Sequence, residues 1–245
     1  VVARARRVQA ELEALAADVA SSLGEIAGPV RFGVIGTTGR WLVPLLLAEV
    51  AASYPKVRLI VVDATTTSLL PQVARGSLDL AIVNLPVADP DVDAELLFEE
   101  EHVLLLSREH PLADRTTIHL SELEDVPLLL EPRGTGFRDD LDADAQRAGI
   151  TLTAQAEVDG MRLLASLAYQ GFGAAILPAS AIVEWTDGSW TTVALEGTSP
   201  RTVGLATPRR GRLSAPTKAS IEVLHELLAA EVPGRPGLRL GTSRG

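Results

Sequence analysis

The sequence predicts an α/β fold of two similar lobes, and two observations lead to this prediction. Short apolar runs rich in β-branched residues, typical of strands buried on both faces of a sheet, recur along the chain. Most of them are followed by a small polar turn and then by an amphipathic helical pattern. This order occurs within residues 30–106 and again within 126–195, so we expect two sheets built with parallel crossovers.

The first repeat is organised around the apolar strand 30–35, a Gly/Thr turn at 36–39 and a helical pattern that begins near Leu42. Such a turn directs backbone N–H groups and threonine hydroxyls beyond the carboxyl end of the strand, where open α/β sheets bind small ligands. The other expected elements are a strand at 57–62, a helix at 69–75 capped by Thr66 to Ser68, a strand at 78–83 that ends at Asn84, and extended runs at 96–98 and 102–106.

The second repeat follows the same order. Its expected elements are a strand at 126–130, a Gly/Thr turn at 131–137, a helix at 138–148, a strand at 153–158, a helix at 161–169 opened by Asp159-Gly160, strands at 171–178, 190–195 and 202–207, a short helix at 179–185 and a last helix at 214–231. We expect the chain to cross between the lobes near Leu106-Ser107 and to return near 202–207, around a hinged cleft. The expected boundaries are 28–106 with 207–232 for the first lobe, 107–206 for the second, and a flexible tail at 233–245.

Residues 1–27 have a pattern of their own, with a period of seven. Two interleaved positions are occupied by Val1, Val8, Leu15 and Ser22, and by Ala5, Leu12, Val19 and Ile26. These two positions form a narrow stripe along the helix, which we call the heptad seam. A stripe this narrow favours pairing with a partner helix. The alternative interpretation is an amphipathic helix packed on its own domain. We expect a dimerisation helix of roughly 40 Å, at 1.5 Å per residue.

Composition excludes several classes of protein. The 245 residues are 47% hydrophobic and 22% charged, and they include no cysteine, which excludes disulfides, thiolate chemistry and Cys-ligated metals in this sequence. The net charge of −10 argues against binding of this chain to a phosphate backbone. No apolar run reaches the roughly 20 residues of a membrane span, and acidic residues interrupt any signal core, so we expect a cytoplasmic protein without a membrane partner.

No pattern indicates catalysis, a cofactor or a metal site. Residues 241–245 match G-x-S-x-G but lack the preceding strand and following helix of a nucleophile elbow. The four histidines lack metal-ligand spacing, and Gly171-Phe172-Gly173 leads into a strand, the wrong order for dinucleotide binding. An enzyme on this scaffold would need converging titratable groups, of which Asp159 is the only candidate, so we expect a protein that is not an enzyme.

Five further segments follow one another in a distinctive order and spacing. They are Leu42-Val43-Pro44, Tyr54-Pro55-Lys56-Val57-Arg58-Leu59, Gly76-Ser77-Leu78-Asp79-Leu80-Ala81-Ile82, Ser107-Arg108-Glu109-His110-Pro111-Leu112, and Gly171-Phe172-Gly173-Ala174-Ala175-Ile176-Leu177-Pro178. Together they resemble the effector-binding domain of LysR-type transcriptional regulators over about 28–232, and residues 1–27 resemble the linker helix of that family. The resemblance implies two Rossmann-like lobes of the type 2 periplasmic-binding-protein fold, joined by two crossover strands and preceded by a long linker helix.

The resemblance also implies partners. These are a small-molecule effector in the cleft between the lobes, a second copy of the chain in a homodimer or homotetramer paired through Val1–Ala27, and DNA, contacted only through an N-terminal winged helix-turn-helix outside this sequence. The runner-up interpretation is a solute-binding protein of a transport system, which shares the fold. Such a protein would need a signal peptide or lipid anchor and would not need a heptad helix.

The ligand-binding residues that the resemblance implies lie on turns. They are Thr37, Thr38, Thr66 and Asn84 in the first lobe, and Arg133, Gly134, Thr135, Phe137 and Asp159 in the second. Hydroxyls, an amide and N–H groups at helix starts suit a carboxylate or another polar effector, although Thr and Asp at such positions also serve as ordinary helix caps. Arg40 and Arg133 are candidate counter-ions, whereas Asn84, where the family sometimes has a basic residue, disfavours a strongly acidic effector.

Overall fold

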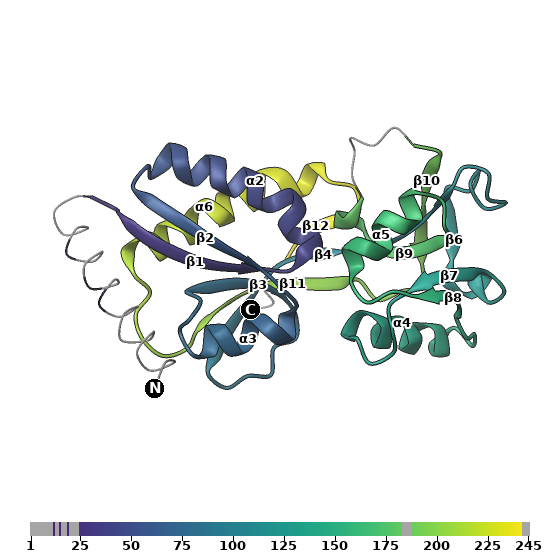
Figure 1. Ribbon diagram of the computed structural model, residues 1–245, viewed down its shortest axis with the longest axis horizontal. Helices are drawn as coiled ribbons and strands as arrows, with labels where there is room; N and C mark the ends of the chain where they lie inside the picture. The colour runs from purple at the N-terminus through teal and green to yellow at the C-terminus, as the bar shows by residue number, and fades with distance from the viewer. Residues whose placement is uncertain (1–11, 13–14, 16–18, 20–24, 183–187, 242–245) are drawn as a thin grey trace. The chain divides into compact units, whose positions relative to one another are not determined.

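The computed structural model describes residues 12, 15, 19, 25–182 and 188–241, which form two compact α/β units (Figure 1). The first unit contains the chain up to Glu99, Thr202–Arg235 and the segment from Arg239. The second contains Glu100–Arg201 and Pro236–Leu238. The predicted α/β class with two sheets is confirmed. Among the described helices, none is long and apolar enough to cross a membrane.

The first unit is built on a six-stranded sheet with the order β12-β4-β11-β3-β1-β2. Its strands are β1 (Gly28–Val34), β2 (Val57–Asp63), β3 (Leu80–Asn84), β4 (Val92–Glu100), β11 (Arg201–Pro208) and β12 (Leu238–Leu240). β1 pairs in parallel with both β2 and β3, as the crossover pattern predicts, and β11 runs antiparallel to β3. The carboxyl ends of the three parallel strands therefore meet at one edge of the sheet.

Helices cover both faces of this sheet. They are α2 (Gly36–Ser53), α3 (Thr66–Ala74), α6 (Ala215–Glu231) and the short η3 (Val232–Gly234). α2 and α6 pack on one face and α3 on the other (Figure 1). The close approach of α3 to β1 requires a glycine, because a Cβ at Gly33 would lie 2.8 Å from side-chain atoms of both Leu69 and Leu78.

The second unit is built on a sheet with the order β6-β10-β5-β9-β7-β8. Its strands are β5 (His102–Ser107), β6 (Thr117–His119), β7 (Pro127–Leu130), β8 (Thr153–Glu157), β9 (Ala174–Pro178) and β10 (Trp190–Glu196). Its helices are α4 (Gly136–Arg147), α5 (Met161–Tyr169), η1 (Leu120–Leu123) and η2 (Ala179–Ala181). Leu141 of α4 and Leu164 of α5 belong to separate apolar clusters, one on each face of the sheet, so this unit also has three layers.

Several expected boundaries differ from the structure. β5 belongs to the second sheet, so the division between the units lies at Glu99/Glu100 rather than near Leu106-Ser107. α2 begins at Gly36, which places Thr37 and Thr38 inside its first turn instead of in a separate turn. The reason is that Ile35, still extended, acts as the N-cap residue, so the strand passes directly into the helix.

The expected flexible tail is also partly ordered. Leu238–Leu240 forms β12 beside β4, and the Gly241 N–H donates to the Leu97 carbonyl at 2.9 Å. The alternation Leu-Arg-Leu buries Leu238 and exposes Leu240, as expected for an edge strand. Most of the heptad helix 1–27 lies outside the described residues, as does the end of the short helix expected at 179–185. The described positions Leu12, Leu15 and Val19 are helical and exposed.

Candidate functional site

The first unit brings four predicted site residues to the carboxyl ends of its parallel strands, and we call Thr37, Thr38, Thr66 and Asn84 the threonine cluster. Thr37 and Thr38, 5% and 0% exposed, open α2 directly after β1. Thr66 opens α3 after β2, and its Oγ1 accepts a hydrogen bond from the Asn84 N–H at 3.0 Å. This bond ties the start of α3 to the end of β3.

The starts of α2 and α3 do not follow the ordinary capping pattern, whereas α6 of the same unit does, with the Ser214 hydroxyl accepting from the Thr217 N–H. The N-cap residues, Ile35 of α2 and Thr65 of α3, make no side-chain capping hydrogen bond. The Thr65 hydroxyl instead contacts the hydroxyls of Thr67 and Ser68, at 3.0 and 3.1 Å. The Asn84 Oδ1 is buried and has no hydrogen-bond partner among the described residues. A buried polar atom without a partner is costly, which makes it a candidate contact for a ligand.

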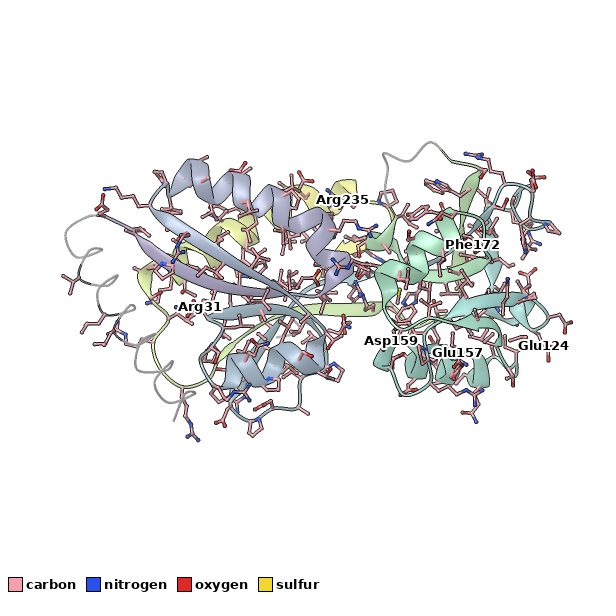
Figure 2. All side chains as sticks on the ribbon, in the orientation of Figure 1. Arg31, Glu124, Glu157, Asp159, Phe172 and Arg235 are labelled. Atoms are coloured by element: carbon pink, nitrogen blue, oxygen red, sulfur yellow. The ribbon has the colours of Figure 1, made fainter. Side chains whose placement is uncertain are left out.

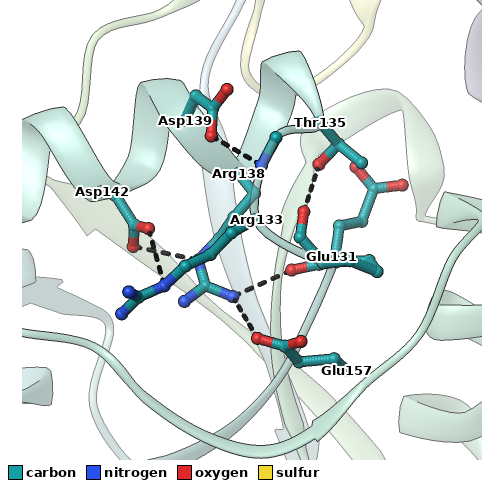
Figure 3. A network of polar contacts seen from close by, with 9 residues as sticks. Glu131, Arg133, Thr135, Arg138, Asp139, Asp142 and Glu157 are labelled. Atoms are coloured by element: carbon teal, nitrogen blue, oxygen red, sulfur yellow. Dashed lines mark hydrogen bonds and ion pairs between the residues drawn. The ribbon is translucent and has the colours of Figure 1, made fainter.

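In the second unit, the turn after β7 is held by a buried arginine that the sequence analysis did not single out (Figure 3). The Arg138 side chain is 2% exposed. Its Nε donates to the Asp142 Oδ1 at 2.9 Å, and its Nη1 donates to the Glu131 carbonyl at 2.9 Å and to the Glu157 Oε1 at 3.3 Å. A buried charge persists only when it is paired, and these contacts fix residues 131–135 onto α4 and β8.

The predicted turn residues around Arg138 have internal partners. The Gly134 N–H donates to the Asp139 Oδ1 at 2.9 Å, and the Thr135 hydroxyl donates to the Pro132 carbonyl at 3.0 Å. Arg133 is 70% exposed, lies 3.8 Å from Asp142, and lines a shallow groove of about 480 Å³ along α4. Thr135 and Arg133 belong to the same turn, but the Thr135 hydroxyl bonds within the turn, whereas the Arg133 side chain is exposed beside Asp142.

Two carboxylates lie near helix starts in the second unit, Glu131 directly after β7 and Asp159 just before α5. Glu131, half-buried, follows β7 and accepts a hydrogen bond from the Gly160 N–H, at the N-cap of α5. Burial raises the pKa of the Glu131 carboxyl above its usual range, and the Asp159 carboxylate adds to this, whereas the Thr135 hydroxyl, the Gly160 N–H and Arg201 act in the opposite direction. Asp159 was among the predicted site residues and Glu131 was not, although the place of Glu131 at the end of a strand was a usable signal.

Phe137, the remaining predicted residue, packs against a buried histidine. The ring of Phe137 lies edge-on to the His102 imidazole, with 5.3 Å between centroids. His102 is 5% exposed, its Nδ1 lies 3.2 Å from the Thr198 Oγ1, and its Nε2 has no hydrogen-bond partner among the described residues. Burial, and then the charge of Arg201, lowers the pKa of His102 to about 4, so the imidazole is neutral at pH 7.

Arg201 is held by a buried carboxylate. The Arg201 Nε donates to the Glu100 Oε1 at 2.5 Å, and Glu100, 0% exposed, also accepts from the Ser180 N–H at 3.0 Å. The Arg201 side chain is 12% exposed. Among the described residues, no group of three His, Asp or Glu side chains could hold a metal ion. The second unit thus offers carboxylates, a neutral imidazole and hydroxyls at the start of α4 and α5.

Two α/β/α units of this topology define a periplasmic-binding-protein-like domain. The family model described as "LysR substrate binding domain" matches residues 23–229. The chain belongs to this family, the substrate-binding domains of LysR-type regulators, as its sequence motifs predicted.

Similar proteins agree with this assignment. A probable hydrogen peroxide-inducible genes activator from Streptomyces viridosporus is 34% identical over 185 residues, which are 74% of this chain and 59% of that protein. The DNA-binding transcriptional dual regulator OxyR of Escherichia coli K12 is 29% identical over 96% of this chain and 76% of its own length. The effector-binding domain of QuiR in complex with shikimate has the same fold, with a TM-score of 0.73 and 21% identity over 84% of this chain and 99% of that domain. The Streptomyces viridosporus and Escherichia coli relatives are named as an activator and a transcriptional regulator.

Proposed function

We propose that this chain is the ligand-sensing part of a LysR-type transcriptional regulator. It binds a small polar effector reversibly through turns at the carboxyl ends of its parallel strands. The observation that supports this proposal most directly is the threonine cluster, where Thr66 and Asn84 are joined and the buried Asn84 Oδ1 has no partner among the described residues. The effector then shifts the populations of two states of the protein, and a DNA-binding domain outside this sequence responds.

Peroxide sensing is the second candidate, because relatives are named as hydrogen peroxide-inducible genes activators. Reversible oxidation by peroxide acts on a thiolate, and this chain has no cysteine and one methionine, Met161. We therefore favour reversible, non-covalent binding over oxidation. Treatment with hydrogen peroxide should leave the melting temperature of the chain unchanged, and an oxidised product with an altered melting temperature would support the second candidate.

The proposal includes self-association and a cytoplasmic location. Leu12, Leu15 and Val19 are 54–62% exposed on helical chain, and all three occupy the heptad seam. We propose that this helix pairs with a second copy in a homodimer or homotetramer. A transport solute-binding protein, the alternative, has no need of such pairing. Sedimentation should show a dimer or larger species that dissociates in a Leu12→Lys/Leu15→Lys variant, and a monomeric wild-type chain would favour the alternative.

A thermal-shift screen tests effector binding. Wild-type chain is heated with small carboxylates, aromatic acids, amines and polyols, and the compound that stabilises it most is tested on Thr37→Val/Thr66→Val. The double variant should lose the stabilisation because it lacks two hydroxyls of the threonine cluster. Thr192→Val, at an exposed position of β10, is the matched control and should respond as wild type does. If the double variant responds like wild type, the binding site lies elsewhere.

A further inference from the structure

We infer that residues 235–241, which we call the C-terminal strap, tie the two units together, so that neither unit can unfold or move away from the other without releasing a contact of the strap. The inference goes beyond the proposed function, because it concerns the connection between the units and not the ligand. It rests on the path of the chain and on three anchoring contacts, each of which joins residues of a single unit.

In the described part of the chain, the strap adds a second connection between the units. The first connection consists of the crossings at Glu99/Glu100, where β4 ends, and at Arg201/Thr202, where β11 begins. The chain crosses again after Arg235, contributes Pro236–Leu238 to the second unit, and returns with Arg239 to the first. The segment expected to be a flexible tail therefore passes through both units.

Arg235 anchors the strap to the first unit. It lies beside α2 (Figure 2), and its guanidinium carbon is 4.3 Å from the centroid of the Trp41 ring. The Trp41 ring packs edge-on against Phe98 of β4, with 6.1 Å between centroids. The Arg235 Nη2 donates to the Glu231 Oε2 at 3.2 Å. A cation that is both stacked on an aromatic ring and paired is held more firmly than an exposed ion pair, so Arg235 fixes the start of the strap on α2.

Gly237 anchors the strap to the second unit. Its carbonyl accepts a hydrogen bond from the Glu101 N–H at 2.8 Å, and the Glu101 carbonyl accepts from the Ala179 N–H at 2.9 Å. Gly237 has a φ of +75°, and a Cβ at this position would lie 2.8 Å from the Ala179 Cβ. Both the backbone conformation and the close approach to Ala179 therefore require glycine.

The strap returns to the first unit at Arg239. β12 lies beside β4 at the edge of the first sheet, and directly after β12 the Gly241 N–H donates to the Leu97 carbonyl at 2.9 Å. The two ends of the strap are thus attached to the first unit, and its middle, at Gly237, is attached to the second.

The strap has little slack between its first two anchors. Arg235 and Gly237 are two positions apart in the chain, so their Cα atoms can be at most roughly 7 Å apart even in fully extended chain. Pro236 fixes its own φ and disfavours a helical conformation at Arg235, which is extended with φ −100° and ψ 120°. A wide movement of either unit therefore has to break the Arg235 contacts or the Gly237 hydrogen bond. The strap in this way limits the amplitude of a hinge motion.

Unfolding of the full chain, followed separately in each unit, tests this inference. Pulsed hydrogen–deuterium exchange along a urea series gives one unfolding midpoint for each unit. We expect the two midpoints to coincide in wild type and to separate by about 0.5 M urea or more in Gly237→Ala, because the added Cβ displaces the second anchor. Exchange of the Glu101 amide in the absence of urea should accelerate by roughly tenfold or more in the same variant.

Gly149→Ala is the matched control. Gly149 has a φ of +79°, and a Cβ there would have no non-neighbouring atom of the described residues within 4 Å. The control therefore introduces similar backbone strain without displacing a contact, and its two midpoints should stay together.

A second pair of variants tests the first anchor, and keeps the test decisive if Gly237→Ala folds poorly. Arg235→Met removes the contacts with Trp41 and Glu231 and should also separate the midpoints. Arg210→Met removes an arginine whose side chain is 89% exposed and should leave the midpoints together.

Three results would contradict the inference. Separate midpoints in wild type would show that the strap does not tie the units together. Coincident midpoints in both Gly237→Ala and Arg235→Met would show that the strap contributes nothing to the connection. An equal separation in Gly237→Ala and Gly149→Ala would assign the effect to backbone strain. None of these results bears on effector binding, which the thermal-shift screen tests separately.

Discussion

At the scale of single residues, His102 controls how stability depends on pH. The imidazole is buried in neutral form with its pKa lowered from 6.5 to about 4, whereas in the unfolded chain it titrates near 6.5. Between these values the unfolded state binds the proton and the folded state does not. The free energy of unfolding should therefore fall as the pH is lowered from about 7 to about 4, by at most roughly 3 kcal/mol from this group.

Urea denaturation between pH 4 and 8 measures this contribution. In His102→Gln the side chain does not titrate, so the stability of wild type relative to this variant should decline as the pH falls. Equal slopes for wild type and His102→Gln would show that the imidazole is not buried in neutral form.

Two of the residues that sequence reasoning missed share one property. Arg138 and His102 acquire their roles through partners distant in the chain, Arg138 through Glu157, 19 residues away, and His102 through Thr198, 96 residues away. Thr37, Thr66 and Asn84 were predictable because their place at the end of a strand follows from local pattern alone. No local pattern shows that Glu131 accepts the Gly160 N–H, because this needs β7 and the start of α5 to lie side by side.

At the scale of elements, the turn before α4 is held in place by one buried cation, Arg138. Arg138→Met would leave the Glu131 carbonyl without its donor, remove the cation that pairs with Glu157 and leave Asp142 with Arg133 alone. We expect a loss of about 2–4 kcal/mol in the free energy of unfolding and weaker effector binding, because the turn 131–135 loses its attachment.

Chemical denaturation of paired variants checks this expectation. Arg133→Met removes a cation from the same helix start, but Arg133 is 70% exposed, so its loss should cost less than about 0.5 kcal/mol. Similar losses for the two variants would mean that burial of Arg138 adds nothing to the stability of the turn.

β12 shows where a prediction from pattern fails. Leu238-Arg239-Leu240 forms a three-residue strand within a Gly- and Pro-rich segment. This strand was not predicted, because an apolar–polar alternation of three residues is too short to indicate a strand. The longer apolar strands were predictable because buried parallel strands need continuous β-branched runs. Short edge strands instead depend on a neighbour that is already in place, here β4.

The burial of Leu238 can be tested against its neighbour on the opposite side of the strand. Leu238 is 7% exposed and Leu240 is 42% exposed. Leu238→Ala should lower the free energy of unfolding by about 2–3 kcal/mol, and Leu240→Ala by less than about 1 kcal/mol. The denaturation midpoints of the two variants give the answer, and equal effects would contradict the packing of β12 on β4.

At the scale of the whole molecule, the two units repeat one design. In each, parallel strands end at helix starts that carry hydroxyl, amide or carboxylate groups. The buried polar atoms without a partner among the described residues include the Asn84 Oδ1 in the first unit and the His102 Nε2 in the second, besides the Nε1 of Trp41 and Trp190 and the Arg235 Nε. The membership of the chain in the LysR substrate-binding family gives this repetition a functional meaning. The proposed function therefore requires that turns at these strand ends contact the effector.

Hydrogen–deuterium exchange tests this requirement most directly. The chain is compared alone and with the compound that stabilises it most in the thermal-shift screen. We expect slower amide exchange around residues 36–38, 66–68 and 84 in the first unit, and around 131–137 and 159–161 in the second. Absence of protection at all of these turns, or protection located only along the groove of α4, would contradict the central claim that turns at the strand ends bind the effector.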